Sequence, residues 1–310
     1  MSAKVRIGLI LALFSAAEIA LTLHLHEVDV QIYHQYAVAF LTPPRFRAWP
    51  QEYPGLAELL FVLPLAYPGS YRVAFALLTL FALTLLVVYG VRRSGDAWGV
   101  RLLWYLAVGS AGLLAQRYDI VAATVTYLGL DAARRGQWRR AWACLVIGVL
   151  LKGYPLVFWP LVAAAQRRER GRWPWLHLAA AVGAAAAGLA LPDLTHPGAA
   201  LNAWRYLAER SIEFESGPAT VLYWFFASRF TSGYGSVNLS AGPVDHLVAL
   251  GMLGVGLGVV GLAAWQVLRG RWPLMQAATL ALGAVLLTSK VFSAQYLLGW
   301  LRWRPRHRST

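Results

Sequence analysis

Apolar runs long enough to cross a membrane alternate along this chain with short gaps, and the gaps differ sharply in charge. Nineteen of the 28 Lys and Arg residues fall into clusters in every second gap, namely Lys4/Arg6, Arg92/Arg93/Arg101, Arg134/Arg135/Arg139/Arg140, Arg167/Arg168/Arg170/Arg172, Arg269/Arg271 and Arg302/Arg304/Arg306/Arg308. By the positive-inside rule these clusters mark the cytoplasmic side of a membrane. The pattern predicts a multi-pass membrane protein whose N-terminus is cytoplasmic. The remaining gaps, which hold most of the 14 acidic residues, are expected to face outward.

Composition excludes a soluble fold. Hydrophobic residues make up 58% of the chain and charged residues 14%, which is too few polar residues to cover a soluble core. A net charge of +14 would suggest nucleic acid as the partner of a soluble protein, but here most of it faces anionic inner-leaflet lipid. We therefore expect membrane lipids as partners and no nucleic acid. The single cysteine, Cys144, lies in an apolar run and is interpreted as packing material.

The fold class predicted from this pattern is all-α, in a single transmembrane domain that covers residues 1–310. About nine or ten spans are expected, near 5–25, 72–91, 99–115, 119–133, 141–152, 154–166, 174–191, 244–268, 273–289 and, in part, 291–301. The apolar stretch 56–66 is interpreted as an interfacial or re-entrant helix, because a crossing there would turn Arg92 and Arg93 outward. The domain includes an outer loop at 26–70, an outer lid at 192–243 and a basic cytoplasmic tail at 302–310.

Two of the predicted helix pairs are unusually short. Fourteen uncharged residues separate Arg101 from the polar tip at 116–119, and a second tip begins at Lys152. Fourteen helical residues cover only about 21 Å, less than a hydrocarbon core of about 30 Å. We therefore predict re-entrant-like hairpins whose tips are recessed in a cavity, where buried charges usually mark a substrate route. In the rival interpretation each hairpin is one long tilted helix.

Lysine is rare, and its placement is informative. Only Lys4, Lys152 and Lys290 occur, and the last two fall in gaps predicted to face outward. A compact ammonium group suits a phosphate or pyrophosphate, whereas arginine offers a planar fork. The alternative is that both lysines extend their charged ends to the membrane surface.

An acidic residue follows the first span. If the first helix continues to Asp29, one of its faces carries Glu18, Thr22, His26 and Asp29. A carboxylate at the mouth of a bundle is able to act as a general base, and its alternative is an ordinary helix-end carboxylate in water. Tyr33 and Tyr36 have a second interpretation as interfacial belt residues, and the nearby histidines show no spacing diagnostic of a metal site.

Several short blocks resemble those of a known family. They are Asp29 with Tyr33, Glu52-Tyr53-Pro54, Arg117-Tyr118-Asp119, Lys152-Gly153-Tyr154-Pro155, Arg210 with Glu215-Ser216, Ser289-Lys290-Val291-Phe292-Ser293, and Gln295-Tyr296-Leu297. Together they are similar to the blocks of family 87 glycosyltransferases. That family belongs to the GT-C superfamily of membrane enzymes that use polyprenyl-phosphate sugars. The resemblance extends over essentially the whole chain.

The resemblance implies a GT-C-like helix bundle whose outer loops form the active site. It implies transfer of a sugar, commonly mannose, from polyprenyl phosphate to a lipid-linked or glycan acceptor at a bacterial plasma membrane, with no cofactor and no metal. Asp29 is the implied general base, and Arg117, Lys152, Arg210 and Lys290 are the candidates that bind the donor phosphate. The residues expected to bind or orient substrate are Tyr33, Glu52, Tyr53, Tyr118, Asp119, Tyr154, Glu215, Ser216, Gln295 and Tyr296.

The sequence departs from the family pattern at two places. Ala294 stands where the family often has proline, and the chain ends soon after Tyr296 where family members continue through further helices. We therefore expect a truncated C-terminus.

A transporter or flippase for a lipid-linked or anionic substrate is the alternative function, although its charges should lie on both sides or at mid-depth. A non-catalytic subunit is the third interpretation.

Overall fold

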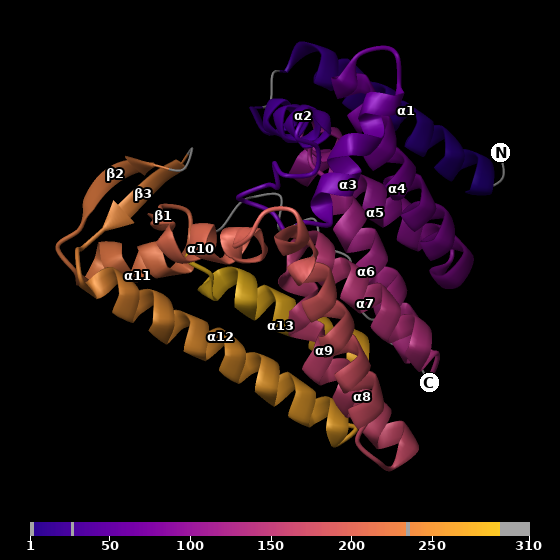
Figure 1. Cartoon of the computed structure of the whole chain (residues 1–310). Coiled ribbons are helices and arrows are strands. Elements are labelled where there is room, and N and C mark those ends of the chain that lie inside the picture. Colours follow the sequence, from indigo (N-terminus) through magenta and orange to yellow (C-terminus); the bar gives the residue numbers. More distant parts are fainter. Residues whose placement is uncertain (1–2, 26–27, 234–235, 292–310) are drawn as a thin grey trace.

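Helices dominate the structure, a computed structural model that describes residues 3–25, 28–233 and 236–291 (Figure 1). Its α-helices are α1 (Ala3–His24), α2 (Val28–Leu41), α3 (Ala57–Val62), α4 (Tyr71–Ser94), α5 (Asp96–Ser110), α6 (Asp119–Arg134), α7 (Trp138–Lys152), α8 (Trp159–Arg170), α9 (Trp175–Ala190), α10 (Asn202–Glu209), α11 (Gly217–Phe225), α12 (Val244–Leu268) and α13 (Leu274–Thr288). Short 3₁₀ helices are η1 (Leu63–Ala66), η2 (Leu114–Gln116), η3 (Tyr154–Phe158), η4 (Leu191–Leu194) and η5 (Ala199–Leu201). The strands are β1 (Ile212–Glu213), β2 (Arg229–Gly233) and β3 (Ser236–Ser240).

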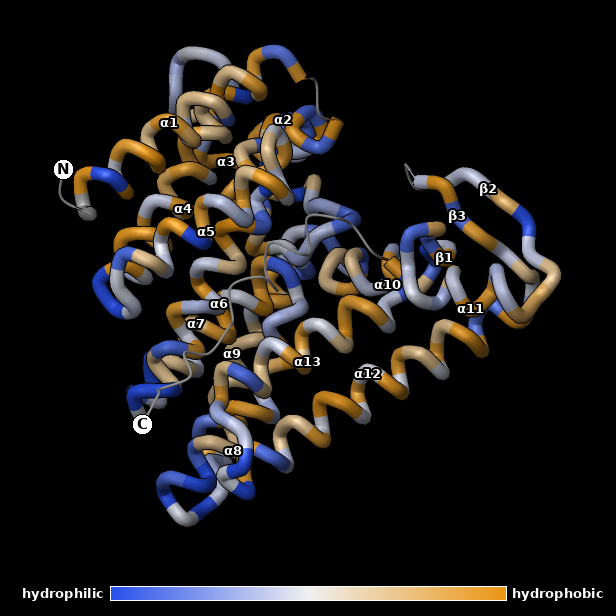
Figure 2. The backbone as a smooth tube through the Cα atoms, turned by 180° about the vertical axis from the view of Figure 1, so that it is seen from behind, coloured by the Kyte–Doolittle hydropathy of each residue, from blue (hydrophilic) through white to orange (hydrophobic). Residues whose placement is uncertain are grey.

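The predicted all-α class and the membrane-spanning character are confirmed. Helices occupy all nine of the predicted spans up to residue 289, and the partial tenth lies almost wholly outside the described residues. Four segments are long and apolar enough to cross a membrane by themselves, namely Val5–His24, Tyr71–Ser94, Trp175–Leu194 and Val244–Leu268. Figure 2 shows the hydrophobic residues along such helices and hydrophilic residues at the turns beside α7 and α8.

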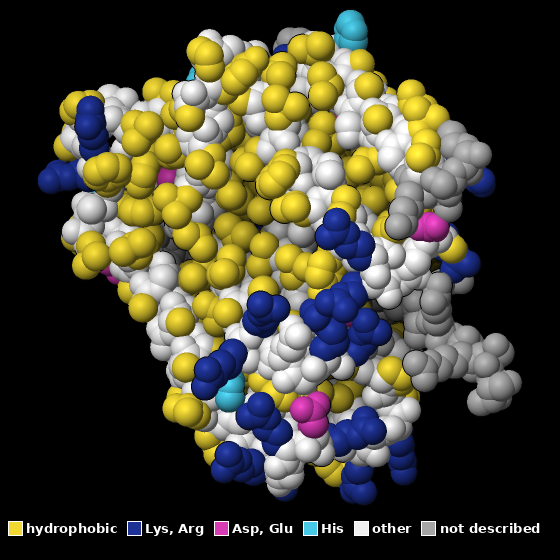
Figure 3. All heavy atoms as spheres, turned by 90° about the vertical axis from the view of Figure 1, so that its right-hand side faces the viewer, with side chains coloured by type: hydrophobic (Ala, Val, Ile, Leu, Met, Phe, Trp, Pro, Cys, Tyr) yellow, Lys and Arg dark blue, Asp and Glu magenta, His cyan; other side chains and the backbone are white. Residues whose placement is uncertain are grey.

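The described basic clusters gather at one end of the bundle, here called the basic end. Glu169 at the end of α8 accepts a hydrogen bond from Trp138 Nε1 at the start of α7, at 3.1 Å. Tyr89 near the end of α4 donates to Asp131 near the end of α6, at 2.6 Å. Figure 3 shows the result on one face, where hydrophobic side chains cover the upper part and most Lys and Arg side chains gather below. The opposite end, called the site end, holds α2, α3 and the tips of the hairpins.

Both predicted hairpins are present, and the interpretation as long tilted helices is wrong. Two hydrogen bonds show that α7 and α8 are antiparallel. Trp142 Nε1 donates to Gln166 Oε1 at 2.8 Å, and Trp138, one turn earlier on α7, contacts Glu169, one turn later on α8. In the α5/α6 pair, the ring of Trp98 near the start of α5 lies 5.7 Å from that of Tyr127 near the end of α6. Gly153, with a φ of +68°, gives α7 the left-handed turn that a glycine allows after its last residue.

The segment 56–66 does not cross the bundle. It forms α3 and η1, which pack on α2 and α4 at the site end. The predicted lid region, 192–243, contains a feature that the sequence did not predict, a three-stranded antiparallel sheet in the order β1-β3-β2. Its small core of Ile212, Ala219, Leu222 and Leu239 joins the sheet to α11. The predicted basic tail at 302–310 lies outside the described residues.

Candidate active site

A polar cavity of about 1110 Å³ opens at the site end, between α2, the hairpin tips and the lid region. Nine of the residues singled out from the sequence line it, namely Asp29, Tyr33, Glu52, Tyr53, Arg117, Tyr118, Lys152, Arg210 and Glu215. The two that are farthest apart in the sequence, Asp29 and Glu215, are separated by 186 positions. The structure therefore brings most of the predicted set to one place, although the role of each residue stays a prediction.

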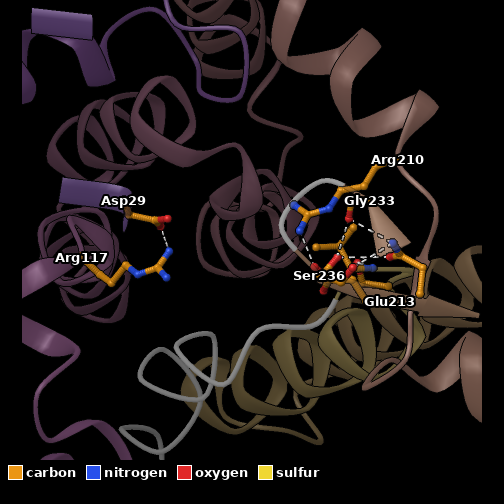
Figure 4. Close-up of polar contacts among 9 residues, drawn as sticks. Asp29, Arg117, Arg210, Glu213, Gly233 and Ser236 are labelled. Carbon is orange, nitrogen blue, oxygen red and sulfur yellow. Dashed lines mark hydrogen bonds and ion pairs between the residues drawn. The ribbon is translucent and has the colours of Figure 1, made fainter. Parts of the chain in front are cut away.

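Asp29 lies in the first turn of α2, where the helix dipole favours a negative charge. It forms an ion pair with Arg117, and Tyr33 Oη donates to Asp29 Oδ2 at 3.5 Å (Figure 4). The first helix does not continue to Asp29, because α1 ends at His24 and Asp29 belongs to a separate helix, so the conditional face of Glu18, Thr22, His26 and Asp29 is not formed. Glu18 instead accepts hydrogen bonds from the backbone of Gly112 and Ala115. Both members of the Asp29–Arg117 pair stay partly accessible from the cavity, with about a fifth of each side chain exposed.

The second hairpin tip contributes Lys152, the last residue of α7. Its ammonium group pairs with Asp119 and lies 4.9 Å from the centre of the Tyr118 ring. Arg117, two residues before Asp119, forms an ion pair with Asp29 instead. Asp119 Oδ2 is buried and has no hydrogen-bond partner among the described residues.

Aromatic rings form the wall behind Asp29. The Tyr33 ring stacks on Phe61 at 4.4 Å and meets Tyr118 edge-on at 5.8 Å, and Tyr53 meets Tyr118 at 5.4 Å. Tyr33 is 1% exposed, so it is a buried wall residue rather than an interfacial belt residue. Its burial, and then its neighbour Tyr53, raise the pKa of Tyr33 well above the ordinary value. The hydroxyl therefore stays protonated and available to donate to Asp29.

The lid side of the cavity carries a second ion pair. Arg210 follows α10 and pairs with Glu213 of β1, apart from the Asp29–Arg117 pair (Figure 4). Burial raises the pKa of Glu52, while the charge of Arg210 partly offsets that rise. Lys290 lies at the edge of the same region, where its Nζ donates to the Ala208 carbonyl at 2.8 Å. Burial, and then the nearby Arg210, lower the pKa of Lys290.

An apolar groove of about 1010 Å³ adjoins the polar cavity. Half of its lining residues belong to α8, α12 and α13, and they include Trp159, Ala164, Leu257, Val260, Gly261, Leu268, Leu282 and Leu286. The groove extends from Asp119 at the site end to Trp173 and Leu268 at the basic end. Lys152, Gly153, Trp204, Leu207 and Val291 line both the groove and the cavity. The cation of Lys152 thus lies where the polar and apolar chambers meet.

The sequence profile of glycosyltransferase family 87 matches residues 52–293 of the chain. The chain belongs to glycosyltransferase family 87. No curated protein and no solved structure shows a significant match. The family assignment makes this protein a glycosyltransferase and favours the enzyme over the transporter among the functions considered above. The matched region includes every block of the resemblance from Glu52 to Ser293, whereas Asp29 and Tyr33 precede it.

The remaining predicted residues of this glycosyltransferase lie around its cavity or beyond it. Asp119 and Tyr154 line the apolar groove, and Tyr154 is followed by Pro155 in η3. Ser216 caps α11, where its Oγ accepts from the Ala219 amide at 3.2 Å, and this capping role needs no substrate. Gln295 and Tyr296 lie outside the described residues.

Some residues in and around the candidate site were not predicted from the sequence. Glu213 is 6% exposed and pairs with Arg210, and only its spacing of three residues from Arg210 could have indicated it. Phe61 and Phe75 belong to apolar runs and carry no signal that separates them from ordinary core residues. Among the described residues, no group of three or more His, Cys, Asp or Glu side chains is arranged to hold a metal ion. That the reaction needs no metal stays a prediction.

Proposed function

We propose that this glycosyltransferase moves a hexose, mannose as the family resemblance implies, from a polyprenyl-phosphate donor to a lipid-linked or glycan acceptor. We place the reaction at the outer face of a bacterial plasma membrane. The observation that supports the donor class is the position of Lys152 on the wall shared by the polar cavity and the apolar groove. A polyprenyl-phosphate sugar has the same order of parts, with a polar sugar, an anionic phosphate and a long apolar chain.

In this proposal Asp29 is the general base. The acceptor hydroxyl gives its proton to the Asp29 carboxylate as its oxygen bonds to C1 of the sugar. The bond between C1 and the phosphate oxygen breaks, and its electron pair stays on the phosphate. Tyr33 holds the carboxylate in place through its hydroxyl. Arg117 pairs with the carboxylate in the resting enzyme, and a neighbouring positive charge favours the charged form that is able to accept a proton.

The cations have a separate task, because the phosphate gains negative charge as it leaves. The donor is a phosphodiester with one negative charge, and the released polyprenyl phosphate is a monoester that carries up to two. Fixed positive charge from Lys152 and Arg117, with Arg210 and Lys290 across the cavity, stabilises that product and the transition state before it. The incoming phosphate also competes with the two aspartates for these cations. It thereby weakens the ion pairs Arg117–Asp29 and Lys152–Asp119.

The donor class can be tested by filling the groove. Gly261 lines the groove and has open space around the position of a Cβ atom, so Gly261→Leu adds bulk where the lipid chain would lie. Gly258 lies on the same helix, also faces open space and does not line the groove, which makes Gly258→Leu the matched control. Radiolabelled mannose transfer is measured with a C50 and a C10 polyprenyl-phosphate donor, and with nucleotide sugars.

We expect Gly261→Leu to lower kcat/KM for the C50 donor about tenfold or more, while the C10 donor and the Gly258→Leu enzyme behave as wild type. Wild-type transfer from a nucleotide sugar but not from the lipid donors would refute the proposed donor. An equal loss with both chain lengths would refute the groove as the binding site of the lipid. A panel of other polyprenyl-phosphate sugars decides whether mannose is the sugar.

A further inference from the structure

A third hollow, here called the side pocket, opens beside the polar cavity. Its volume is about 530 Å³, within the range of about 300 to 1,000 Å³ typical of small-molecule sites. Polar and aromatic side chains line it, among them Gln35, Tyr36, Trp49, Gln51, His196 and Asn202. Glu52 and Ile32 line both the side pocket and the polar cavity, so the two hollows adjoin one another. None of the steps proposed above uses the side pocket.

Helix α2 connects the two hollows. Asp29, Ile32 and Gln35 follow one another at intervals of three residues, so each is a neighbour of the next on successive turns, and the row curves about a third of the way around the helix. Asp29 lines the cavity, Ile32 lines both hollows, and Gln35 lines the side pocket. Gln35 lies six positions after Asp29, which corresponds to about 9 Å along the helix axis. A linear molecule whose reacting group lies at Asp29 would reach the side pocket with its next units.

The chemistry of the side pocket fits neutral carbohydrate. Gln35, Gln51 and Asn202 supply amides, each of which both donates and accepts hydrogen bonds, as the hydroxyl groups of a sugar also do. Tyr36 and Trp49 supply rings on which the apolar face of a sugar can pack. The cavity gathers Arg117, Lys152 and Arg210, whereas among the described residues Arg47 is the one Lys or Arg side chain that lines the side pocket, and the acidic Glu52 also lines it. An anionic phosphate is therefore better held in the cavity and an uncharged polyol in the side pocket.

The walls of the side pocket are fixed by contacts between distant segments. Trp49 Nε1 donates to Thr195 Oγ1 at 2.8 Å, across 146 positions of sequence. The Tyr36 hydroxyl accepts a hydrogen bond from the backbone N–H of Gln51 at 3.4 Å. These bonds hold the segment after α2 against the beginning of the lid region, so the hollow is preformed. A preformed site loses less free energy to ordering when a ligand binds.

We propose that the side pocket binds the inner sugars of a neutral oligosaccharide acceptor, so that the enzyme extends an existing glycan rather than glycosylating a single sugar. This inference rests on the proposed function, since it takes Asp29 as the place where the acceptor hydroxyl reacts. The terminal sugar of the acceptor lies in the polar cavity, and the sugars behind it lie along α2 toward Gln35 and Asn202.

The test compares short and long acceptors in a matched pair of variants. Gln35→Met removes the amide from the side pocket and keeps the length of the side chain. Gln31→Met makes the same change one turn earlier on α2, at an exposed residue that lines neither hollow. Transfer from a polyprenyl-phosphate mannose donor is measured with octyl mannoside and octyl mannotrioside as acceptors. Binding of free mannotriose, maltotriose and cellotriose is measured separately by saturation-transfer NMR.

We expect wild-type kcat/KM to be at least tenfold higher for the trisaccharide acceptor. Gln35→Met should lower that value about fivefold, the cost of one hydrogen bond, with no change for octyl mannoside or for the KM of the donor. Gln31→Met should match wild type. Equal use of the two acceptors by wild type, or an equal loss with both in Gln35→Met, would overturn the proposal.

The binding measurement separates this proposal from the proposed function. If no sugar is transferred to either acceptor, binding of a trisaccharide that Gln35→Met weakens and Gln31→Met leaves intact still supports the side pocket. If wild type binds none of the three trisaccharides, the side pocket is refuted even when mannose transfer to octyl mannoside proceeds.

Discussion

Helix α6 carries a buried aspartate near each end, and the two carboxylates differ in how completely their oxygens are hydrogen-bonded. At the basic end, Asp131 is 0% exposed and every oxygen of its carboxylate has a partner. Tyr89 donates to Oδ2 at 2.6 Å, Arg134 donates to Oδ1 at 2.7 Å, and Arg135 Nε lies 3.0 Å from Oδ2. At the site end, Asp119 pairs with Lys152 through Oδ1, while its buried Oδ2 has no partner among the described residues.

The difference separates two uses of a buried charge. Buried polar atoms are nearly always hydrogen-bonded, and an atom that is not needs a specific explanation. A saturated carboxylate such as Asp131 has nothing left to offer a ligand, and it joins the ends of α4 and α6. An incompletely bonded carboxylate such as Asp119, on the wall of the apolar groove and beside a cation, is consistent with a site completed by substrate.

The largest expected effect comes from the proposed base. Asp29→Asn keeps the shape of the side chain but is unable to accept the proton of the acceptor hydroxyl, so turnover should fall by about two to four orders of magnitude. Binding of the lipid donor should persist. Turnover per folded molecule and donor binding are measured for Asp29→Asn and Asp119→Asn side by side, with the smaller loss expected for Asp119→Asn. Normal turnover in Asp29→Asn would refute its role as the base.

The saturated aspartate should behave in the opposite way. Asp131→Asn removes the negative charge from a cluster that holds two arginines, and we expect the free energy of unfolding to fall by about 3 kcal/mol. The loss should not be larger, because half of the Arg134 side chain is exposed and keeps its contact with water. Thermal unfolding in detergent measures the change. Turnover per folded molecule should stay near wild type, and a selective loss of turnover would break the comparison.

Lys152 should affect donor binding more than stability. Lys152→Met removes the cation at the junction of the two chambers, and the Kd for the polyprenyl-phosphate donor should rise about ten- to a hundredfold. Lys152→Arg should restore only part of the affinity, because a planar fork does not reproduce a compact charge. The double variant Lys152→Met/Asp119→Asn controls for the unpaired carboxylate. Wild-type donor affinity in both Met variants would assign Lys152 a structural role alone.

The last prediction concerns how stability depends on pH through Glu58 of α3, a carboxyl outside the membrane-spanning segments. Both of its oxygens are buried without partners among the described residues, and burial raises its pKa from an ordinary 4.5 to about 8. The folded protein therefore holds this proton more tightly than the unfolded chain does. The stability that the proton contributes is complete below pH 4.5 and is lost as pH rises from there to about 8, by at most about 1.4 kcal/mol per pH unit.

Glu58→Gln should remove that pH dependence, because an amide of nearly the same shape does not titrate. Melting temperatures of wild type and Glu58→Gln, measured between pH 5 and pH 9, should diverge up to about pH 8 and then keep a constant difference, with the variant the more stable. Glu209 is an exposed carboxylate on α10, and Glu209→Gln serves as the control that should follow wild type. Parallel curves for wild type and Glu58→Gln would show that Glu58 is already ionised in the folded protein.

The helical layout could be predicted from the sequence because charge and hydropathy act locally. A helix surrounded by lipid must end near its charged residues, so Arg92, Arg134 and Arg167 were enough to indicate where α4, α6 and α8 end. The hairpin tip at Lys152 followed from the same reasoning. The strands of the lid region were missed because their segments are short and mix polar with aromatic residues, as Arg229 and Phe230 illustrate.

The site could be predicted as a set of residues but not as a set of contacts. Asp29, Arg117 and Lys152 line one cavity, as the shared placement of their blocks suggested. Their pairing depends on how the chain turns at Tyr118, which sequence spacing does not reveal. The apolar groove gave no signal at all, because it is formed by ordinary leucines, alanines and tryptophans of several helices.

The shared wall at Lys152 also determines by which route each of the two proposed products would leave the enzyme. Several residues of the groove are well exposed on the surface of the bundle, including Leu257, Trp265 and Trp173. In a bilayer, a spent lipid phosphate could diffuse sideways among its neighbours through that opening, while the lengthened glycan withdraws into water from the other chamber. Each product would then depart through a different medium, and neither would have to pass the other before the next round of catalysis.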